Sequence, residues 1–424
     1  MDDLVFKLVS IAGFAVICFL AWATGDRFSL NKSTICGSLF LSWSIGLLTF
    51  WVPWSHQAIQ FLNQVLIVTI EASKKGILFL FGPLALGPGD SLPDGTSSIG
   101  FILGMQVLPS IIFFSALASG LYYLKLLPTL VNFFSRLFYK FMRLSGAESL
   151  SAAANIFFGI ESGLLIKPYL KQMTRSEILT LLTCMMSTVA STVMGVYIIA
   201  LHKVFPQIAG HLASASLISI PCAVLISKLS LPEQDQPETI SKRITEKSFS
   251  DNPPNNLMAA LIEGGGQGVK LSVGIATLLI IILGFEAILD LVLGFFQTGN
   301  NQPLSLSQIL KWISFPFVIL LGLKPDEWAA GAEILGTRFI ETEVTAYFSL
   351  ASAQTEGVFS QRSLTILSYS LCGFVHIASL GIFIGGLSAL APERSRDLSI
   401  LGIRSFWTAY LTTLLTGCIA GAFA

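Results

Sequence analysis

Polar residues interrupt apolar sequence at Gly146-Ala-Glu-Ser-Leu-Ser-Ala-Ala-Ala-Asn155-Ile-Phe-Phe-Gly-Ile-Glu161-Ser-Gly-Leu-Leu-Ile-Lys167-Pro-Tyr169. They do so again at Gly336-Thr-Arg-Phe-Ile-Glu-Thr-Glu343-Val-Thr-Ala-Tyr347. Both stretches are too apolar for a solvated loop, yet each carries carboxylates. An ionisable side chain at membrane depth costs at least about 2.5–3.5 kcal/mol and marks, by default, the path of a substrate or an ion. The two stretches therefore predict transport across a membrane.

The composition of the whole chain is that of a membrane protein. Of its 424 residues, 53% are hydrophobic and 12% are charged, whereas soluble domains carry roughly 25% charged residues. The mean hydropathy is +0.74, and long apolar stretches recur from Leu4 to Ala424. We therefore predict an all-α polytopic membrane protein. The acidic start Met-Asp-Asp, with no clean small-residue cleavage site after it, favours a retained first span over a signal peptide.

About eight apolar segments approach the ~20 residues needed to cross a ~30 Å hydrocarbon core. They are Leu4–Thr24, Thr34–Trp54, Ile99–Leu124, Ser176–His202, Leu217–Leu231 with the residues before it, Val269–Phe296, Arg362–Leu390 and Ser405–Ala424. Two further segments, Gln57–Leu78 and Leu126–Leu144, mix apolar and cationic residues. We expect both to be amphipathic helices lying in the membrane interface, with ordinary short spans as the alternative.

One soluble stretch divides the chain into two halves. Residues 230–256 are rich in Pro, Ser, Gln and charge, which is typical of a flexible linker. The other predicted parts are N-terminal transmembrane and interfacial helices (1–95) and the first (96–229) and second (257–424) halves of a transport core. Short apolar pieces broken by Gly, Ser or Pro predict re-entrant hairpins at residues 147–172 and about 305–330. Such hairpins accompany discontinuous helices around a binding site at the membrane midplane.

Other classes of function find little support in the residues. The six cysteines and four histidines are scattered without the spacing of a metal site or a disulfide framework. The sequence shows no basic stripe for nucleic acid and no nucleophile–base spacing for an enzyme. Gly264-Gly-Gly-Gln-Gly lacks the Lys-Ser/Thr of a phosphate-binding loop. We expect neither enzymatic activity nor a cofactor other than a coupling ion.

From about Thr96 to the C-terminus, the sequence resembles the concentrative nucleoside transporter family. The resemblance lies in blocks that follow one another in the family's order: Glu148–Leu170, Met186–Val193 through Ala209–Ser219, Gly336–Tyr347 and Tyr369–Ile382, continued by Gly385–Arg404. It implies eight spans, two hairpins and interfacial helices in a homotrimer within the lipid bilayer of the bacterial inner membrane. Members import nucleosides against a gradient, coupled to sodium or protons, by an elevator-like movement of the hairpin-containing domain.

The resemblance also implies a sodium site between the first hairpin tip and an unwound part of the next span. Asn155 matches the side-chain ligand, and Phe158 stands where a backbone carbonyl contributes. Thr188 has a hydroxyl where the family has a serine, and Val189 offers its carbonyl. A hard cation takes oxygen ligands of this kind. Without the family context, a cap or turn bond is the alternative for Asn155, and a hydrogen bond back to its own helix is the alternative for Thr188.

The substrate side of the site is implied in the same way. Glu343 matches the acid that holds ribose hydroxyls, and a carboxylate can accept from two hydroxyls at once. Phe374 matches an aromatic that stacks on the base, Ser379 a ribose-side hydroxyl, and Val193 an apolar contact to the base. Taken alone, Phe374 is explained by plain packing.

Three departures from the family pattern bear on the substrate. In Gly159-Ile160-Glu161-Ser162 the family's glutamine is absent and the stretch is one residue short, so Glu161 matches either the family's glutamate or its hydroxyl residue. His376 stands where the family has a ribose-binding asparagine, and its ring can still donate and accept hydrogen bonds. Glu341 is an additional acid that can share a proton with Glu343 in an unwound segment. These changes predict altered base selectivity.

The sequence thus favours a cation-coupled nucleoside importer, with sodium ahead of protons as the coupling ion. One alternative is a symporter of another small polar metabolite on the same scaffold. The other is a non-transporting membrane protein that retains the hairpin domain for assembly or signalling. Retention of the matched ion and sugar residues together speaks against the second alternative.

Overall fold

The computed structural model describes residues 2–27, 29–51, 53–87, 91, 95–100, 102–159, 162–239, 254–296 and 303–424. Up to the predicted linker, its helices are α1 (Asp2–Ala23), α2 (Lys32–Trp51), α3 (Pro53–Phe81), η1 (Gly82–Ala85), α4 (Leu103–Gln106), α5 (Leu108–Tyr123), α6 (Leu126–Met142), α7 (Gly146–Ala154), α8 (Ser162–Leu170), α9 (Arg175–Ser187), α10 (Ser191–Leu201) and α11 (Ile208–Ser230). After it come α12 (Leu257–Leu293), α13 (Leu306–Leu321), η2 (Pro325–Glu327), α14 (Trp328–Thr337), α15 (Glu343–Thr355), α16 (Gln361–Ser370), α17 (Ile377–Leu390), η3 (Pro392–Arg394) and α18 (Ser395–Phe423).

Six helical segments within the described ranges are long and apolar enough to cross a membrane. They are Leu4–Ala23, Lys32–Trp51, Leu103–Tyr123, Ile208–Ser230, Leu257–Leu293 and Pro392–Phe423. The two other predicted spans correspond to interrupted pairs, α9–α10 and α16–α17. The prediction of an all-α membrane protein with discontinuous helices is confirmed.

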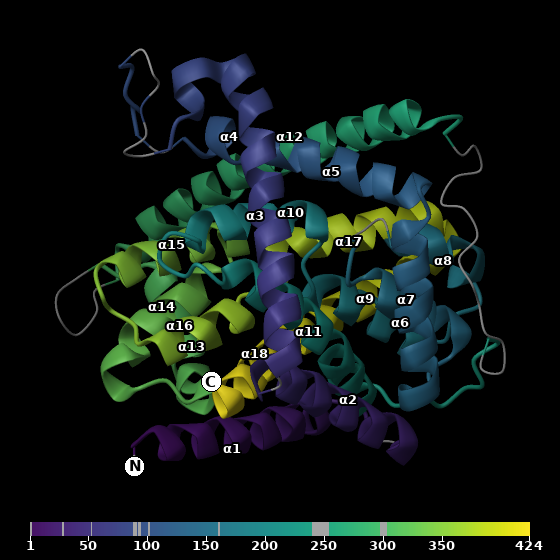
Figure 1. Ribbon diagram of the computed structural model, residues 1–424. Coiled ribbons are helices and arrows are strands. Elements are labelled where there is room, and N and C mark those ends of the chain that lie inside the picture. The colour runs from purple at the N-terminus through teal and green to yellow at the C-terminus, as the bar shows by residue number, and fades with distance from the viewer. Residues whose placement is uncertain are drawn as a thin grey trace.

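The helix α3 runs in a different direction from the apolar spans. Figure 1 shows it crossing the molecule steeply relative to α5 and α12, and it packs against α5, α10 and α11. A helix in this orientation lies along the membrane surface when its neighbours span the membrane. The helix α6 packs against α2 and α7 and presents one apolar face to the core, with Val131 and Phe138 fully buried. The placement of Gln57–Leu78 and Leu126–Leu144 in the membrane interface stays a prediction.

The two halves repeat one order of elements. A pair of short helices (α7–α8 or α14–α15) is followed by a broken helix (α9–α10 or α16–α17) and then by a long one (α11 or α18). Their packing also corresponds, because α9 contacts α11 as α16 contacts α18, while α10 contacts α15 as α17 contacts α8. Each half therefore completes the other, as in transporters built from repeats around a central site.

The second pair of short helices lies later than the segment predicted for the second hairpin. Residues 305–330 hold α13, a turn at Gly322 in the left-handed conformation (φ 80°) and the start of α14. The pair that matches α7–α8 is α14–α15, whose tip is formed by residues 338–342. The division of the chain into domains stays a prediction, and residues 240–253 of the expected linker lie outside the described residues.

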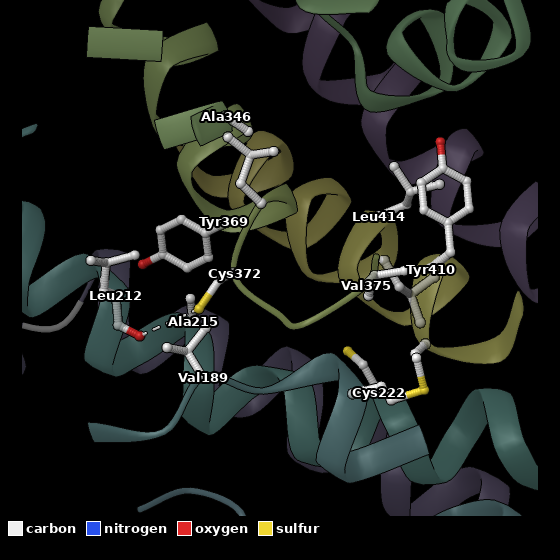
Figure 2. Close-up of a cluster of buried hydrophobic side chains, with 14 of the residues drawn as sticks. Val189, Leu212, Ala215, Cys222, Ala346, Tyr369, Cys372, Val375, Tyr410 and Leu414 are labelled. Atoms are coloured by element: carbon white, nitrogen blue, oxygen red, sulfur yellow. Dashed lines mark hydrogen bonds between the residues drawn. The ribbon is translucent and has the colours of Figure 1, made fainter. Parts of the chain in front are cut away.

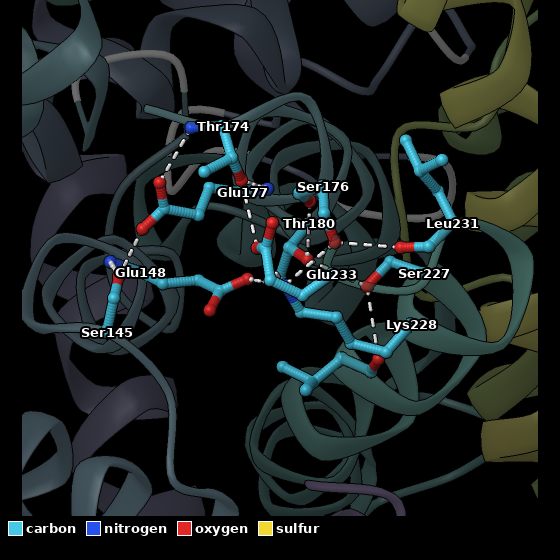
Figure 3. Close-up of polar contacts among 11 residues, drawn as sticks. Ser145, Glu148, Thr174, Ser176, Glu177, Thr180, Ser227, Lys228, Leu231 and Glu233 are labelled. Atoms are coloured by element: carbon cyan, nitrogen blue, oxygen red, sulfur yellow. Dashed lines mark hydrogen bonds and ion pairs between the residues drawn. The ribbon is translucent and has the colours of Figure 1, made fainter. Parts of the chain in front are cut away.

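Buried charges join the base of the first hairpin to the ends of two other helices (Figure 3). Lys228 near the end of α11 places its Nζ 2.6 Å from Glu148 Oε1 of α7 and donates to Ser176 Oγ at 3.0 Å. Both charged side chains are less than a tenth exposed. Ser145 caps α7 and donates to Glu177 of α9. Since every buried charge in this group has polar partners, the network holds the hairpin base in one geometry.

The start of the predicted linker packs onto the same hairpin base. Gly146 N donates to the carbonyl of Thr239 at 3.0 Å, and Ala147 N donates to the Thr239 hydroxyl at 3.2 Å. Glu233 accepts from Thr174 at 2.9 Å. Residues 231–239 are therefore part of the folded core around α7 and α9.

Lys228→Met should destabilise the protein strongly, because it leaves the Glu148 carboxylate buried without its partner. Breaking a buried pair in this way costs about 3–5 kcal/mol, whereas replacing both partners with apolar residues is often neutral. We expect a lower thermal unfolding midpoint for Lys228→Met and recovery in Lys228→Met/Glu148→Leu. The matched control is Lys171→Met, which removes an exposed ion pair with Glu393 worth about 0–1 kcal/mol. Equal midpoints for Lys228→Met and the control would contradict the role of the network.

Candidate functional site

The carboxylate of Glu343 lies buried at the N-terminus of α15. Glu343 is 3% exposed. Thr342, the residue before it, caps the helix by accepting a hydrogen bond from Thr345 N. An anionic group is stabilised at this end of a helix because unpaired N–H groups and the helix dipole face it. The break before α15 therefore provides a place where a buried negative charge can be held.

Two side chains from other elements approach this carboxylate. Tyr197 of α10 donates its hydroxyl to Glu343 Oε1 at 2.8 Å, and His376 Nε2 lies 3.2 Å from Glu343 Oε2. The Tyr197 ring also stacks on Tyr347, one turn further along α15, with centroids 4.5 Å apart and an interplanar angle of 24°. Glu343 thus joins α10 of the first half to α15 and the second broken helix.

His376 is held by the helix that it begins. Its Nδ1 accepts from Ser379 N at 3.2 Å, and the Ser379 hydroxyl donates to the His376 carbonyl at 2.6 Å. Because Nδ1 accepts a hydrogen bond, the ring proton of this arrangement sits on Nε2, the nitrogen that faces Glu343. The structure therefore brings three of the predicted substrate residues together: Glu343, His376 and Ser379.

The remaining predicted substrate residues have different surroundings. Val193 is buried one turn before Tyr197 on α10. Phe374 is partly exposed, two residues before His376, and its ring centre lies 6.2 Å from that of Phe383. Glu161 lies outside the described residues. Sequence reasoning missed Tyr197, for which the only signal was a tyrosine inside an apolar segment.

The predicted ion residues lie at the first hairpin tip and at the first helix break. Asn155 ends α7 and is fully buried; its Nδ2 donates to Ser151 O at 2.9 Å, and its Oδ1 accepts from Ser162 at 2.8 Å across the tip. Phe158 is 9% exposed. These hydrogen bonds of Asn155 are turn contacts, the alternative to ion binding that the sequence left open. A carbonyl oxygen with one donor still has a second lone pair for a cation.

The break between α9 and α10 has oxygens of the same kind. Thr188 is extended and donates to Cys184 O at 2.9 Å, which is the back-bond considered from the sequence. Val189 is buried in the break. The helix α7 packs against α9, and the hydroxyl of Ser187 is buried without a hydrogen-bond partner among the described residues. The donor set at the tip and the break therefore suits a hard cation.

The two broken helices pass close to each other at their breaks. A Cβ atom added to Gly373, in the α16–α17 break, would lie 3.0 Å from Met186 O and 3.0 Å from Ser187 C at the end of α9. Figure 2 shows Val189 and Cys372, one from each break, in one cluster of buried side chains. The two backbones are therefore in close contact at this crossing, where a side chain larger than that of glycine would require its neighbours to shift.

Family models for nucleoside transporters match most of the chain. The model described as "Na+ dependent nucleoside transporter N-terminus" covers residues 12–84, "Nucleoside recognition" covers 104–203, and "Na+ dependent nucleoside transporter C-terminus" covers 211–421. The three matches follow one another along the chain, and the last of them begins within α11, before the predicted linker.

Individual relatives and solved structures agree with the family models. The chain is 31% identical to nucleoside permease NupC of Helicobacter pylori, over 98% of both chains. It is 30% identical to sodium/nucleoside cotransporter 1 of Rattus norvegicus, over 98% of this chain and 63% of that protein. A structure of CNTnw in an inward-facing substrate-bound state superimposes with a TM-score of 0.88 at 28% identity, over 99% and 98% of the two chains. This chain belongs to the concentrative nucleoside transporter family, whose members are membrane transporters and not enzymes.

Gly373→Ala should force the two breaks apart. The added methyl group would meet backbone atoms of α9, which cannot turn away as a side chain can, and such overpacking typically costs about 1–3 kcal/mol. We expect a lower thermal unfolding midpoint for the purified variant. Gly381→Ala in α17 is the control, because a Cβ there meets nothing within 4 Å. A Gly373→Ala protein as stable as this control would show that the breaks are not in close contact.

Proposed function

We propose that the protein imports nucleosides across the bacterial inner membrane by cation-coupled symport. The observation that carries this proposal is the buried carboxylate of Glu343, held between α10, α15 and the α16–α17 break. Its position in the motif matches the ribose-binding acid of the family. Each carboxylate oxygen has two acceptor sites, so Glu343 can bind ribose hydroxyls while it keeps Tyr197 and His376 as partners.

The base of the nucleoside would lie toward Phe374 and Val193. Phe374 is partly exposed, and an aromatic ring that reaches the substrate can stack on a base in a way that is tolerant of base identity. His376 offers Nε2–H beside Glu343, where an asparagine would offer an amide. A nucleoside hydroxyl that pairs with Glu343 would therefore meet the imidazole N–H of His376, whose position differs from that of an asparagine amide. This difference supports altered selectivity among nucleosides.

Sodium is the coupling ion that the residues favour. Oxygens of Asn155, Phe158, Thr188 and Val189 would surround it between the hairpin tip and the α9–α10 break. Such a bound ion would join the hairpin tip to the helix break, so ion binding would order the site before the substrate binds. The family descriptions as "Na+ dependent" support sodium over protons.

Transport would proceed by an elevator-like movement of the hairpin-containing domain in a homotrimer. Solved structures of the relative CNTnw carry the descriptions inward-facing, outward-facing and intermediate, which supports movement between such states. In this chain, the interlocked packing of α8 with α17 and of α10 with α15 favours movement of both hairpins as one body.

Uptake into proteoliposomes tests the proposal directly. Labelled uridine and adenosine are offered under an imposed sodium gradient, an imposed proton gradient or no gradient. We expect accumulation of at least one nucleoside under the sodium gradient alone. Accumulation under the proton gradient would instead identify protons as the coupling ion. No accumulation under any gradient, from protein with a cooperative thermal unfolding transition, would favour a different polar substrate.

Glu343→Gln should remove most nucleoside uptake while the protein stays folded. An amide offers one acceptor oxygen without charge, and charge-assisted hydrogen bonds are worth about 1.5–3 kcal/mol, or roughly tenfold or more in affinity. Equilibrium binding and uptake of the labelled nucleoside measure the loss. Glu333→Gln on the exposed face of α14 is the matched control and should behave as wild type. Near-normal transport by Glu343→Gln would remove the proposed role of this carboxylate.

Asn155→Ala should raise the sodium concentration needed for half-maximal uptake. The substitution removes one oxygen of the proposed ion site, so the loss should be partly overcome at high sodium. The control is Asn31→Ala, which removes an asparagine that caps α2. A half-maximal sodium concentration equal to that of the wild type would speak against the ion site, whatever the maximal rate.

A further inference from the structure

Arg338 is a buried cation that no part of the proposed site yet explains. It follows α14 directly and is 0% exposed. The Nη1 of Arg338 donates to the carbonyl of Ser370 and to the hydroxyl of Thr413, the latter at 3.2 Å. Its Nη2 donates to the carbonyl of Gly373 at 3.2 Å. Among the described residues, no carboxylate lies within ion-pair distance of this guanidinium. Neutral oxygens therefore surround the positive charge.

These oxygens belong to the end of a broken helix. Ser370 is the last residue of α16, and Gly373 lies in the break before α17. Carbonyls at a helix C-terminus lack partners within the helix and carry a partial negative charge. A cation at this point supplies both the missing hydrogen bonds and the compensating charge, which is why an unpaired arginine is tolerated there. Hard metal cations bind oxygen ligands of the same kind.

Arg338 and Asn155 occupy corresponding places in the two halves. Each is the residue after the first short helix of its pair, with helical backbone angles (φ −65° and ψ −11° for Asn155, φ −58° and ψ −25° for Arg338). Each begins a tip that faces the half's own broken helix. In the first half, the proposed sodium ion would lie between tip and break. In the second half, the guanidinium of Arg338 lies between the tip and the α16–α17 break.

We propose that Arg338 is a tethered cation that holds the tip of the second hairpin (residues 338–342) to the α16–α17 break, leaving the first half as the one site for an exchangeable cation. Arg338 is thus a positioning residue, because the same tip leads directly to Glu343. A second contact supports this link, since Ile377 N of α17 donates to Phe339 O at 3.0 Å. The count of exchangeable ions rests on the proposed function, whereas the tethering role does not.

Three substitutions separate charge from volume. Arg338→Lys keeps the positive charge, Arg338→Met keeps much of the volume without charge, and Arg338→Ala leaves a cavity lined by the same oxygens. Lysine is a point charge that cannot reproduce the two-pronged contact of a guanidinium. We expect nucleoside affinity to fall on the order of tenfold or more in Arg338→Met and less in Arg338→Lys. Equal losses in Arg338→Lys and Arg338→Met would overturn the role of the charge.

Chemical rescue of Arg338→Ala tests the tethering without any nucleoside. Millimolar methylguanidinium should raise the thermal unfolding midpoint of this variant, whereas tetramethylammonium, which cannot donate hydrogen bonds, should not. Wild-type protein under the same additives corrects for general effects on stability. No selective gain with methylguanidinium would overturn the proposal. This readout stands even if the wild-type protein binds no nucleoside, an outcome that would remove the proposed function alone.

Sodium dependence of the wild-type protein tests the single exchangeable site, and it remains decisive if the alanine variant does not fold. Nucleoside binding should rise with sodium with a Hill coefficient of about one, since one ion couples to one substrate site. A coefficient approaching two would overturn this part of the proposal. The control for the variants is Arg362→Met, which also removes an arginine that donates to backbone carbonyls, those of Gly322 and Gly421. It should lower stability without changing the sodium dependence.

Discussion

Backbone groups released at membrane depth must find partners within the protein, and this constraint shapes the interior. Two helices are broken where they cross, and Gly373 brings one break against the end of α9. The freed groups are satisfied by particular side chains. Arg338 binds carbonyls at the end of α16, and His376 caps the start of α17. Without these partners the α16–α17 break would leave several unpaired backbone groups in an apolar core.

The same constraint explains why the site combines binding groups with structural ones. Glu343 sits at a helix start because the free N–H groups there stabilise its charge. Tyr197 and His376 then fix the orientation of its carboxylate from two different elements. A ligand that pairs with Glu343 therefore meets a rigid group, and little side-chain freedom remains to be lost on binding. The first half differs, since the residue at the corresponding place of its tip is Asn155, whose side chain is neutral and hydrogen-bonds within the hairpin.

Much of the architecture followed from local sequence. The segments Leu4–Thr24 and Thr34–Trp54 correspond to α1 and α2, and Ser176–His202 corresponds to the α9–α10 pair. Apolar runs of this length allow few alternatives in a membrane. The pair of short helices that matches α7–α8 is α14–α15, whereas the segment predicted for the second hairpin holds α13, also a short apolar helix ended by a glycine. Its length and composition resemble those of a hairpin arm, and only its packing distinguishes it.

Individual residues of the candidate site could be proposed from the sequence, but the contacts between them could not. Glu343 stands out because polar groups are costly in apolar segments, a property of the residue and its immediate neighbours. His376 was named only because the family resemblance places a ribose-binding residue at its position. The contact between Tyr197 and Glu343 joins positions 146 residues apart, one in each half. The contact of Arg338 with Gly373 depends on how the end of α14 packs against the α16–α17 break of the same half. Local propensity and hydropathy carry no information on such pairs. The chain's own pattern determined where helices form and break, whereas tertiary packing, both within the second half and between the halves, decided which polar groups meet at the breaks.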